Sequence, residues 1–116
     1  MNSLQEINQR LMTLPRTAWD AFKFYAEKKE EFAAMDNQRK SMLAIYELKY
    51  SDCKSQAEIQ RNALADKDYK EFLDKLSVVE AEFIKAQSRV EAVKAEISIL
   101  QTISKNLIAE SQITHT

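Results

Sequence analysis

The sequence predicts an all-α protein built on a long, coiled-coil-like antiparallel helical hairpin, and three observations support this fold class. The 116 residues contain no glycine and one proline, which disfavours the primed turns of β-hairpins and glycine-rich phosphate-binding loops. Apolar residues recur in alternating three- and four-residue steps along most of the chain, the period of amphipathic helices. Hydrophobic residues make up 45% and charged residues 30%, and this length allows one helical domain over residues 1–116.

The first predicted element is a short helix over about residues 3–13. Ser3 and Glu6 have the spacing of a capping box, which marks a helix start. The helix is expected to stop before Pro15, because a proline disfavours the helical conformation of the residue that precedes it. Its apolar side is Leu4, Ile7 and Leu11.

A long helix is predicted next, over about residues 17–53. Thr17 and Asp20 repeat the capping spacing, and the helix is expected to end near Cys53. Its apolar stripe is Trp19, Phe22, Tyr25, Phe32, Met35, Met42 and Tyr46. The aromatic cluster Trp19, Phe22, Phe24 and Tyr25 is interpreted as core from this spacing, with a base-stacking platform as the alternative.

A turn and connector are expected over about residues 54–67. Serines and Asp52 within 51–55 are turn and cap formers, so the chain is expected to reverse there. Ser55 and Glu58 have the capping spacing again, and a short connector helix is predicted over 57–64.

The last predicted element is a long helix over about residues 68–111 with a sustained heptad pattern. Its stripe is Tyr69, Phe72, Leu76, Val79, Phe83, Ala86, Val90, Val93, Ile97, Leu100 and Leu107. Such a period indicates a left-handed supercoiled seam, so the two long helices are expected to pair antiparallel, with the N-terminal helix packed on them. Apolar residues left over suggest a homo-oligomer. The predicted oligomer interface is Ile97, Leu100, Ile103, Leu107 and Ile108.

No enzyme or metal-site motif is found, so we expect neither catalysis, nor a metal, nor a cofactor. The single cysteine, Cys53, and the single histidine, His115, cannot form a zinc site, and Cys53 is expected to be an inert, partly buried residue. Asp66, Asp68, Glu71 and Asp74 form a carboxylate cluster in the sequence. Asp68, Glu71 and Asp74 are interpreted as favouring a helix N-terminus, with metal binding as the alternative. One cysteine, no signal peptide and no apolar run of membrane-spanning length predict a cytoplasmic protein without a membrane.

Basic residues are dense along the first long helix and near the turn. The net charge is −1, from 17 basic and 18 acidic side chains. A solvated, ion-paired face is one interpretation, and a nucleic-acid surface is the other, because several copies in a ring would repeat a weak basic patch. The candidate nucleic-acid-binding residues are Arg39, Lys40, Lys49, Lys54 and Arg61.

The order of segments resembles a known family. A lysine-rich helix with Gln38-Arg39-Lys40 leads into a charged turn, then Ala63-Leu64-Ala65-Asp66-Lys67-Asp68-Tyr69, then a long helix that opens Leu76-Ser77-Val78-Val79-Glu80. This layout, over about residues 26–111, resembles the UvsY-like recombination mediators of T-even phages and small helical proteins encoded beside phage single-strand annealing proteins. The glycine-bearing loop of that family is absent here.

The resemblance implies an oligomeric helical protein that binds single-stranded DNA. Such mediators help to load a RecA-like recombinase onto strands covered by single-strand-binding protein. The family's DNA contacts lie at the end of the first long helix, which corresponds to Lys49 and Lys54, with Arg39, Lys40 and Arg61 flanking. The other hypothesis is a coiled-coil adaptor, a chaperone or a phage-encoded inhibitor of a host protein, without nucleic-acid binding.

Overall fold

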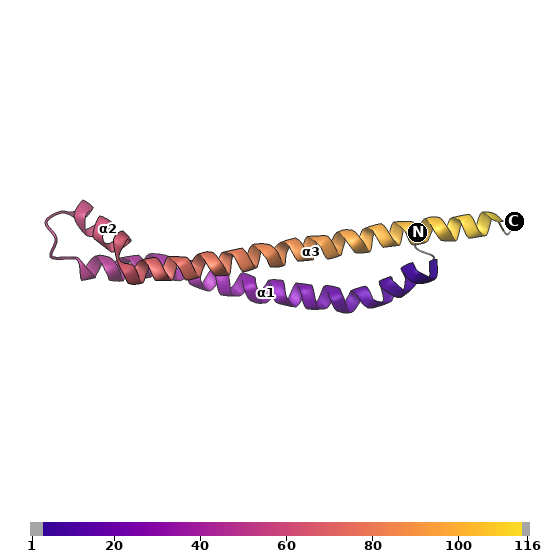
Figure 1. Ribbon diagram of the computed structural model, residues 1–116, viewed down its shortest axis with the longest axis horizontal. Helices are drawn as coiled ribbons and strands as arrows, with labels where there is room; N and C mark the ends of the chain where they lie inside the picture. Colours follow the sequence, from indigo (N-terminus) through magenta and orange to yellow (C-terminus); the bar gives the residue numbers. More distant parts are fainter. Residues whose placement is uncertain (1–3, 115–116) are drawn as a thin grey trace. The chain divides into compact units, whose positions relative to one another are not determined.

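A computed structural model of the chain describes residues 4–114, which form three helices and no strand (Figure 1). Helix α1 spans Leu4–Lys49, α2 spans Gln56–Ala65 and α3 spans Lys67–Thr114. The prediction of an all-α helical hairpin is confirmed, and so is the short connector helix. The predicted Ser3 cap lies outside the described residues. None of the three helices is both long and apolar enough to cross a membrane.

The chain divides into two compact units, and both units are built from α1 and α3. One unit contains the residues up to Ala26 and from Lys85 onward, and the other is Glu27–Ile84. In each unit a segment of α1 runs antiparallel to a segment of α3. The heptad pattern of both helices explains this pairing, because it places one apolar stripe on each.

In the first unit, hereafter the terminal unit, two small apolar clusters hold the helices together. One cluster joins Ala18 and Ala21 of α1 to Val90 and Val93 of α3. Alanine at these positions allows close approach of the two backbones. The second cluster joins Ile7 and Leu14 to Leu100, with Leu11, Ile97 and Leu107 packed against it. Outside these clusters, Arg10 forms a bidentate ion pair with Glu96. Its Nε donates to Oε1 at 2.6 Å and its Nη2 donates to Oε2 at 3.1 Å.

The predicted helix break at Pro15 is wrong, because α1 continues through this residue. Proline in a helix removes one hydrogen bond and crowds the preceding turn, at about 3 kcal/mol. Ile7 and Leu14 are almost fully buried against α3, and each such side chain contributes about 1.5–3 kcal/mol. Burial of these two side chains before Pro15, and of Ala18 and Ala21 after it, therefore outweighs its penalty. Thr17, the predicted cap, lies within the helix, and its hydroxyl donates to the Thr13 carbonyl at 3.4 Å.

The substitution Pro15→Ala is expected to raise the free energy of unfolding by about 2 kcal/mol, since it restores a backbone donor at an exposed helix position. Urea denaturation followed by circular dichroism measures this. A matched exposed substitution, Gln9→Ala, is expected to change stability by less than about 0.5 kcal/mol. Destabilisation by Pro15→Ala would contradict the continuous helix.

The second unit, hereafter the turn unit, contains the end of α1, α2 and the beginning of α3. The rings of Phe32 and Phe83 stack with centroids 5.6 Å apart. The ring of Tyr46 packs on that of the buried Tyr69, with centroids 5.7 Å apart. Lys28, which interrupts the apolar stripe, donates to Glu82 at 2.6 Å and to Glu31 at 3.2 Å. The charge is thus tolerated at a seam position because α3 supplies a carboxylate.

Candidate functional site

Three of the five predicted DNA-binding residues, Lys49, Lys54 and Arg61, lie at the connection from α1 to α2 or within α2, and this connection is therefore the candidate site. Arg39 and Lys40 lie on α1, nine or more residues before its end. α1 ends at Lys49 and not near Cys53, because the amides of Tyr50 and Ser51 bond to carbonyls three residues back, at 3.1 and 3.2 Å. This tightening ends the helix. Ser55 is the N-cap of α2, as its spacing to Glu58 predicted, and its hydroxyl accepts from the Glu58 amide at 3.1 Å.

Asp66 connects all three helices of the turn unit. It is the C-cap of α2 with an extended backbone, and its Oδ1 accepts from the amides of Asp68 and Tyr69 at the start of α3, at 2.8 and 3.4 Å. Its Oδ2 accepts from Lys49 Nζ at 2.8 Å and from the Tyr50 hydroxyl at 2.6 Å, at the end of α1. No residue among 4–114 has a positive φ. The chain therefore turns between α2 and α3 without glycine, through a capping aspartate.

The hydrogen bonds of Asp66 change the proton affinity of all three partners. Hydrogen bonds from Lys49 and Tyr50 hold the pKa of the Asp66 carboxyl far below its usual range. The hydrogen bond that Lys49 donates to Asp66 raises the pKa of Lys49. The separate bond from the Tyr50 hydroxyl to Asp66, together with burial of the phenol, raises the pKa of Tyr50. The ion pair is complete at neutral pH, since Asp66 is ionised and Lys49 protonated there.

Two of the five predicted DNA-binding residues are ion-paired within the part of the chain that the structure describes, and three are not. Lys49 is paired with Asp66, and its ammonium lies 5.6 Å from the Tyr50 ring centroid. Arg39 is exposed, and its guanidinium lies 3.5 Å from the Asp36 carboxylate one turn earlier. Lys40, Lys54 and Arg61 are exposed, and no carboxylate within residues 4–114 pairs with them.

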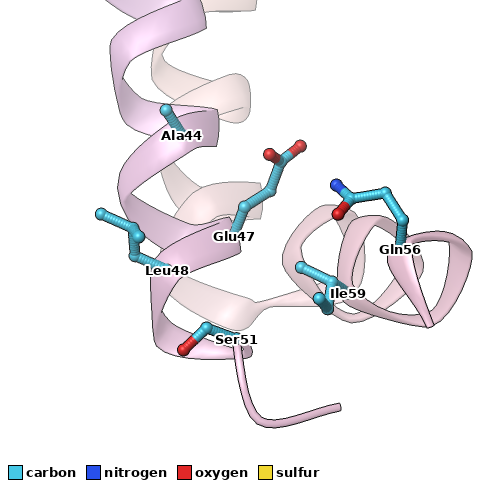
Figure 2. A pocket seen from close by; sticks show the side chains of 6 residues that line it. All are labelled: Ala44, Glu47, Leu48, Ser51, Gln56 and Ile59. Atoms are coloured by element: carbon cyan, nitrogen blue, oxygen red, sulfur yellow. The ribbon is translucent and has the colours of Figure 1, made fainter. Parts of the chain in front are cut away.

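An open apolar hollow of about 370 Å³ lies between the end of α1 and α2 (Figure 2). Ala44, Leu48 and Ile59 supply its apolar surface, and Glu47, Ser51 and Gln56 supply polar groups. In Figure 2 the carboxylate of Glu47 and the amide of Gln56 extend toward the same opening. Leu48 is 73% exposed. The hollow can therefore take an apolar side chain.

The predicted oligomer interface is largely used within the chain. Leu100 is buried in the cluster with Ile7 and Leu14, and Ile97 and Leu107 pack against the same cluster. These three residues lie on the heptad stripe of α3, and this stripe packs against α1 of the same chain. Only Ile103 and Ile108 of the predicted set remain exposed.

The interpretation of the aromatic cluster as core is wrong for three of its four members. Trp19 is 66% exposed, and Phe22 and Phe24 are each 40% exposed, whereas Tyr25 packs against the Ala18–Val90 cluster. The buried stripe of α1 passes through Leu14, Ala18 and Ala21. Ala18 and Ala21 therefore form the contact surface of α1 in this region. A prediction based on the large apolar side chains does not identify them.

The capping role of Asp66 is not among the predicted site features. An aspartate directly before a helix is a strong capping signal, but Asp66 is one of four carboxylates within residues 66–74, and the sequence does not single it out. Asp68 does lie in the first turn of α3, as expected. Cys53 is partly buried and accepts a hydrogen bond from the Asn62 amide at 3.3 Å.

Residues 4–114 contain no group of three or more histidine, cysteine or carboxylate side chains placed to hold a metal ion. No family model, curated protein or solved structure matches the chain.

Proposed function

We propose that this protein is an accessory protein of homologous recombination that binds single-stranded DNA as a homo-oligomer. It acts by binding and not by catalysis. It assists the loading of a RecA-like recombinase onto strands covered by single-strand-binding protein, in the cytoplasm, or in the host's cytoplasm for a phage protein. The DNA-binding part is supported by three exposed, unpaired cations, Lys54 and Arg61 at the α1–α2 connection and Lys40 on α1 before it. The recombination role comes from the resemblance to UvsY-like mediators.

Electrostatic capture of phosphates is the mechanism that suits these residues. Lysine and arginine bind the backbone of any sequence, and binding releases counterions, so affinity falls as salt rises. A chain of net charge −1 presents too few cations to hold a strand tightly as a single copy. Assembly of several copies along one strand multiplies the weak interactions into avidity.

The triple variant Lys40→Glu, Lys54→Glu and Arg61→Glu is expected to weaken binding of a fluorescent single-stranded oligonucleotide by tenfold or more at low salt. Fluorescence anisotropy measures the affinity. The slope of log affinity against log salt is expected to fall by about 0.7 for each phosphate that the variant no longer neutralises.

The matched control is the triple variant Lys70→Glu, Lys75→Glu and Lys105→Glu, which changes three exposed lysines of α3. The two triple variants have the same net charge. Equal losses in the two variants would mean that only net charge matters, and the proposed site would be wrong. No binding by the native protein at low salt would remove the DNA function altogether.

An adaptor, chaperone or inhibitor that binds a helix of another protein is the second candidate function. The apolar hollow beside the exposed Leu48 favours it, because such a surface fits the apolar side chain of an amphipathic helix. Under this function the charge reversals leave partner binding unchanged, whereas Leu48→Asp or Ile103→Asp abolishes it. Leu100→Asp cannot discriminate, because Leu100 is buried in the chain's own core.

A further inference from the structure

We infer that Trp19, with Arg16 and Lys23, forms a second binding surface for single-stranded DNA, in which a base stacks on the indole and the two cations hold the neighbouring phosphates. The inference rests on the proposed DNA binding. It concerns residues of the terminal unit that lie outside the basic set around the α1–α2 connection.

The exposure of Trp19 is the first observation. Its side chain is 66% exposed, on a helix whose seam is made by Leu14, Ala18 and Ala21. Phe22 lies one turn further along and is 40% exposed. A large aromatic surface left in water is available for stacking on a base, and every base offers a π-face.

The second observation is the position of the cations. Arg16 and Lys23 lie three residues before and four residues after Trp19, and this spacing places all three on one side of a helix. Both cations are exposed, and no carboxylate within residues 4–114 pairs with them. Asp20 lies four residues after Arg16 and three before Lys23, on the same side of the helix, so two cations and one acid leave this face with a net positive charge. An aromatic side chain between cations is the usual combination for a single strand.

Charge favours a nucleic acid over a second copy of the chain at this surface. Symmetric pairing of two copies through Trp19 would bring Arg16 and Lys23 against the same two cations of the other copy, and such like-charge juxtaposition opposes association. A single strand supplies both the π-face that suits Trp19 and the anions that suit Arg16 and Lys23. DNA is therefore the occupant that satisfies all three side chains.

Trp19 is the only tryptophan of the chain, so its fluorescence reports on this surface directly. Titration of the native protein with oligothymidylate is expected to quench the emission at the same DNA concentrations that raise the anisotropy of a labelled strand. Trp19→Ala is expected to weaken binding about tenfold, the effect of losing one stacked base. Trp19→Phe, which keeps a π-face, is expected to stay within about threefold of the native affinity.

A control variant and a folding measurement separate the role of Trp19 from general effects of the substitution. Val78→Ala removes an exposed apolar side chain of α3 that lies outside this surface and is expected to leave the affinity unchanged. Circular dichroism verifies that each variant is folded. DNA binding without quenching, and without loss in Trp19→Ala, would overturn this inference while the proposed function stands. Dissociation of a native oligomer by Trp19→Ala would instead assign the surface to a second copy. No DNA binding by the native protein would overturn both proposals.

Discussion

Asp66→Ala is expected to lower the Tm by roughly 10 °C, because one buried carboxylate holds the start of α3, the end of α2 and the end of α1. Its substitution leaves the Asp68 and Tyr69 amides without their acceptor and Lys49 and Tyr50 without theirs. A missing cap and a broken ion pair are both among the few mechanisms of large destabilisation. Differential scanning calorimetry measures the shift.

The matched variant Asp66→Asn separates the cap from the charge. Asparagine is also a good N-cap but cannot form the ion pair with Lys49, so its Tm is expected to lie between those of the native and alanine proteins. Ser55→Ala, which removes the cap of α2 alone, is expected to have the smaller effect of a single cap. A Tm of Asp66→Ala equal to that of Ser55→Ala would show that Asp66 is no more than an ordinary cap.

The lowered pKa of Asp66 also sets how stability depends on pH. Because the folded pKa is depressed, the contribution is complete above the unfolded pKa of about 3.9 and is lost as the pH falls from there toward the folded pKa. Lys49 has a raised pKa in the folded protein. Its contribution to stability is therefore complete below its unfolded pKa of about 10.4 and is lost as the pH rises above that value toward the folded pKa. Acid titration of the helical signal is expected to be shallower below about pH 4 in Asp66→Asn than in the native protein.

Leu14→Ala is expected to lower the free energy of unfolding by about 3 kcal/mol, since it leaves a cavity beneath α1 where Leu14 is packed with Ile7 and Leu100. Met12→Ala removes a side chain of similar size two residues away. Met12 is 81% exposed, so the change is expected to stay below about 0.5 kcal/mol. Chemical denaturation of both variants measures the difference.

The Leu14–Met12 pair also tests the correction at Pro15. If the first turns of α1 formed a separate, loosely attached helix, both substitutions would have small effects of similar size. A large difference between them is expected only when the residues before Pro15 are docked on α3. Amide hydrogen exchange in residues 4–14 provides an independent measurement, with protection expected on the Ile7–Leu14 side of the helix.

The candidate site and the core of the terminal unit can be predicted from the sequence to different extents. The Ser55–Glu58 spacing correctly predicted the start of α2, because a cap is a local interaction between residues three apart. The basic residues could be found in the sequence, but the pairing of Lys49 with Asp66 joins residues of different helices, and no local pattern reveals it. Ile97, Leu100 and Leu107 belong to the predicted oligomer interface, but the structure packs them against α1 of the same chain. Periodicity shows that an apolar stripe is covered, but it does not show which helix covers it.

What the sequence determined by itself is the class of fold: a chain without glycine and with heptad spacing forms long helices that pair along an apolar stripe. Local chemistry also determined the connector helix. Only the tertiary structure decided that Pro15 stays within a helix, that small alanines and not Trp19 form the seam of α1, and that Asp66 joins three helices. The physical reason is that these outcomes depend on burial against a distant segment. The free energy of that burial exceeds the local preference of a proline or an aromatic residue, and neighbouring residues do not reveal it.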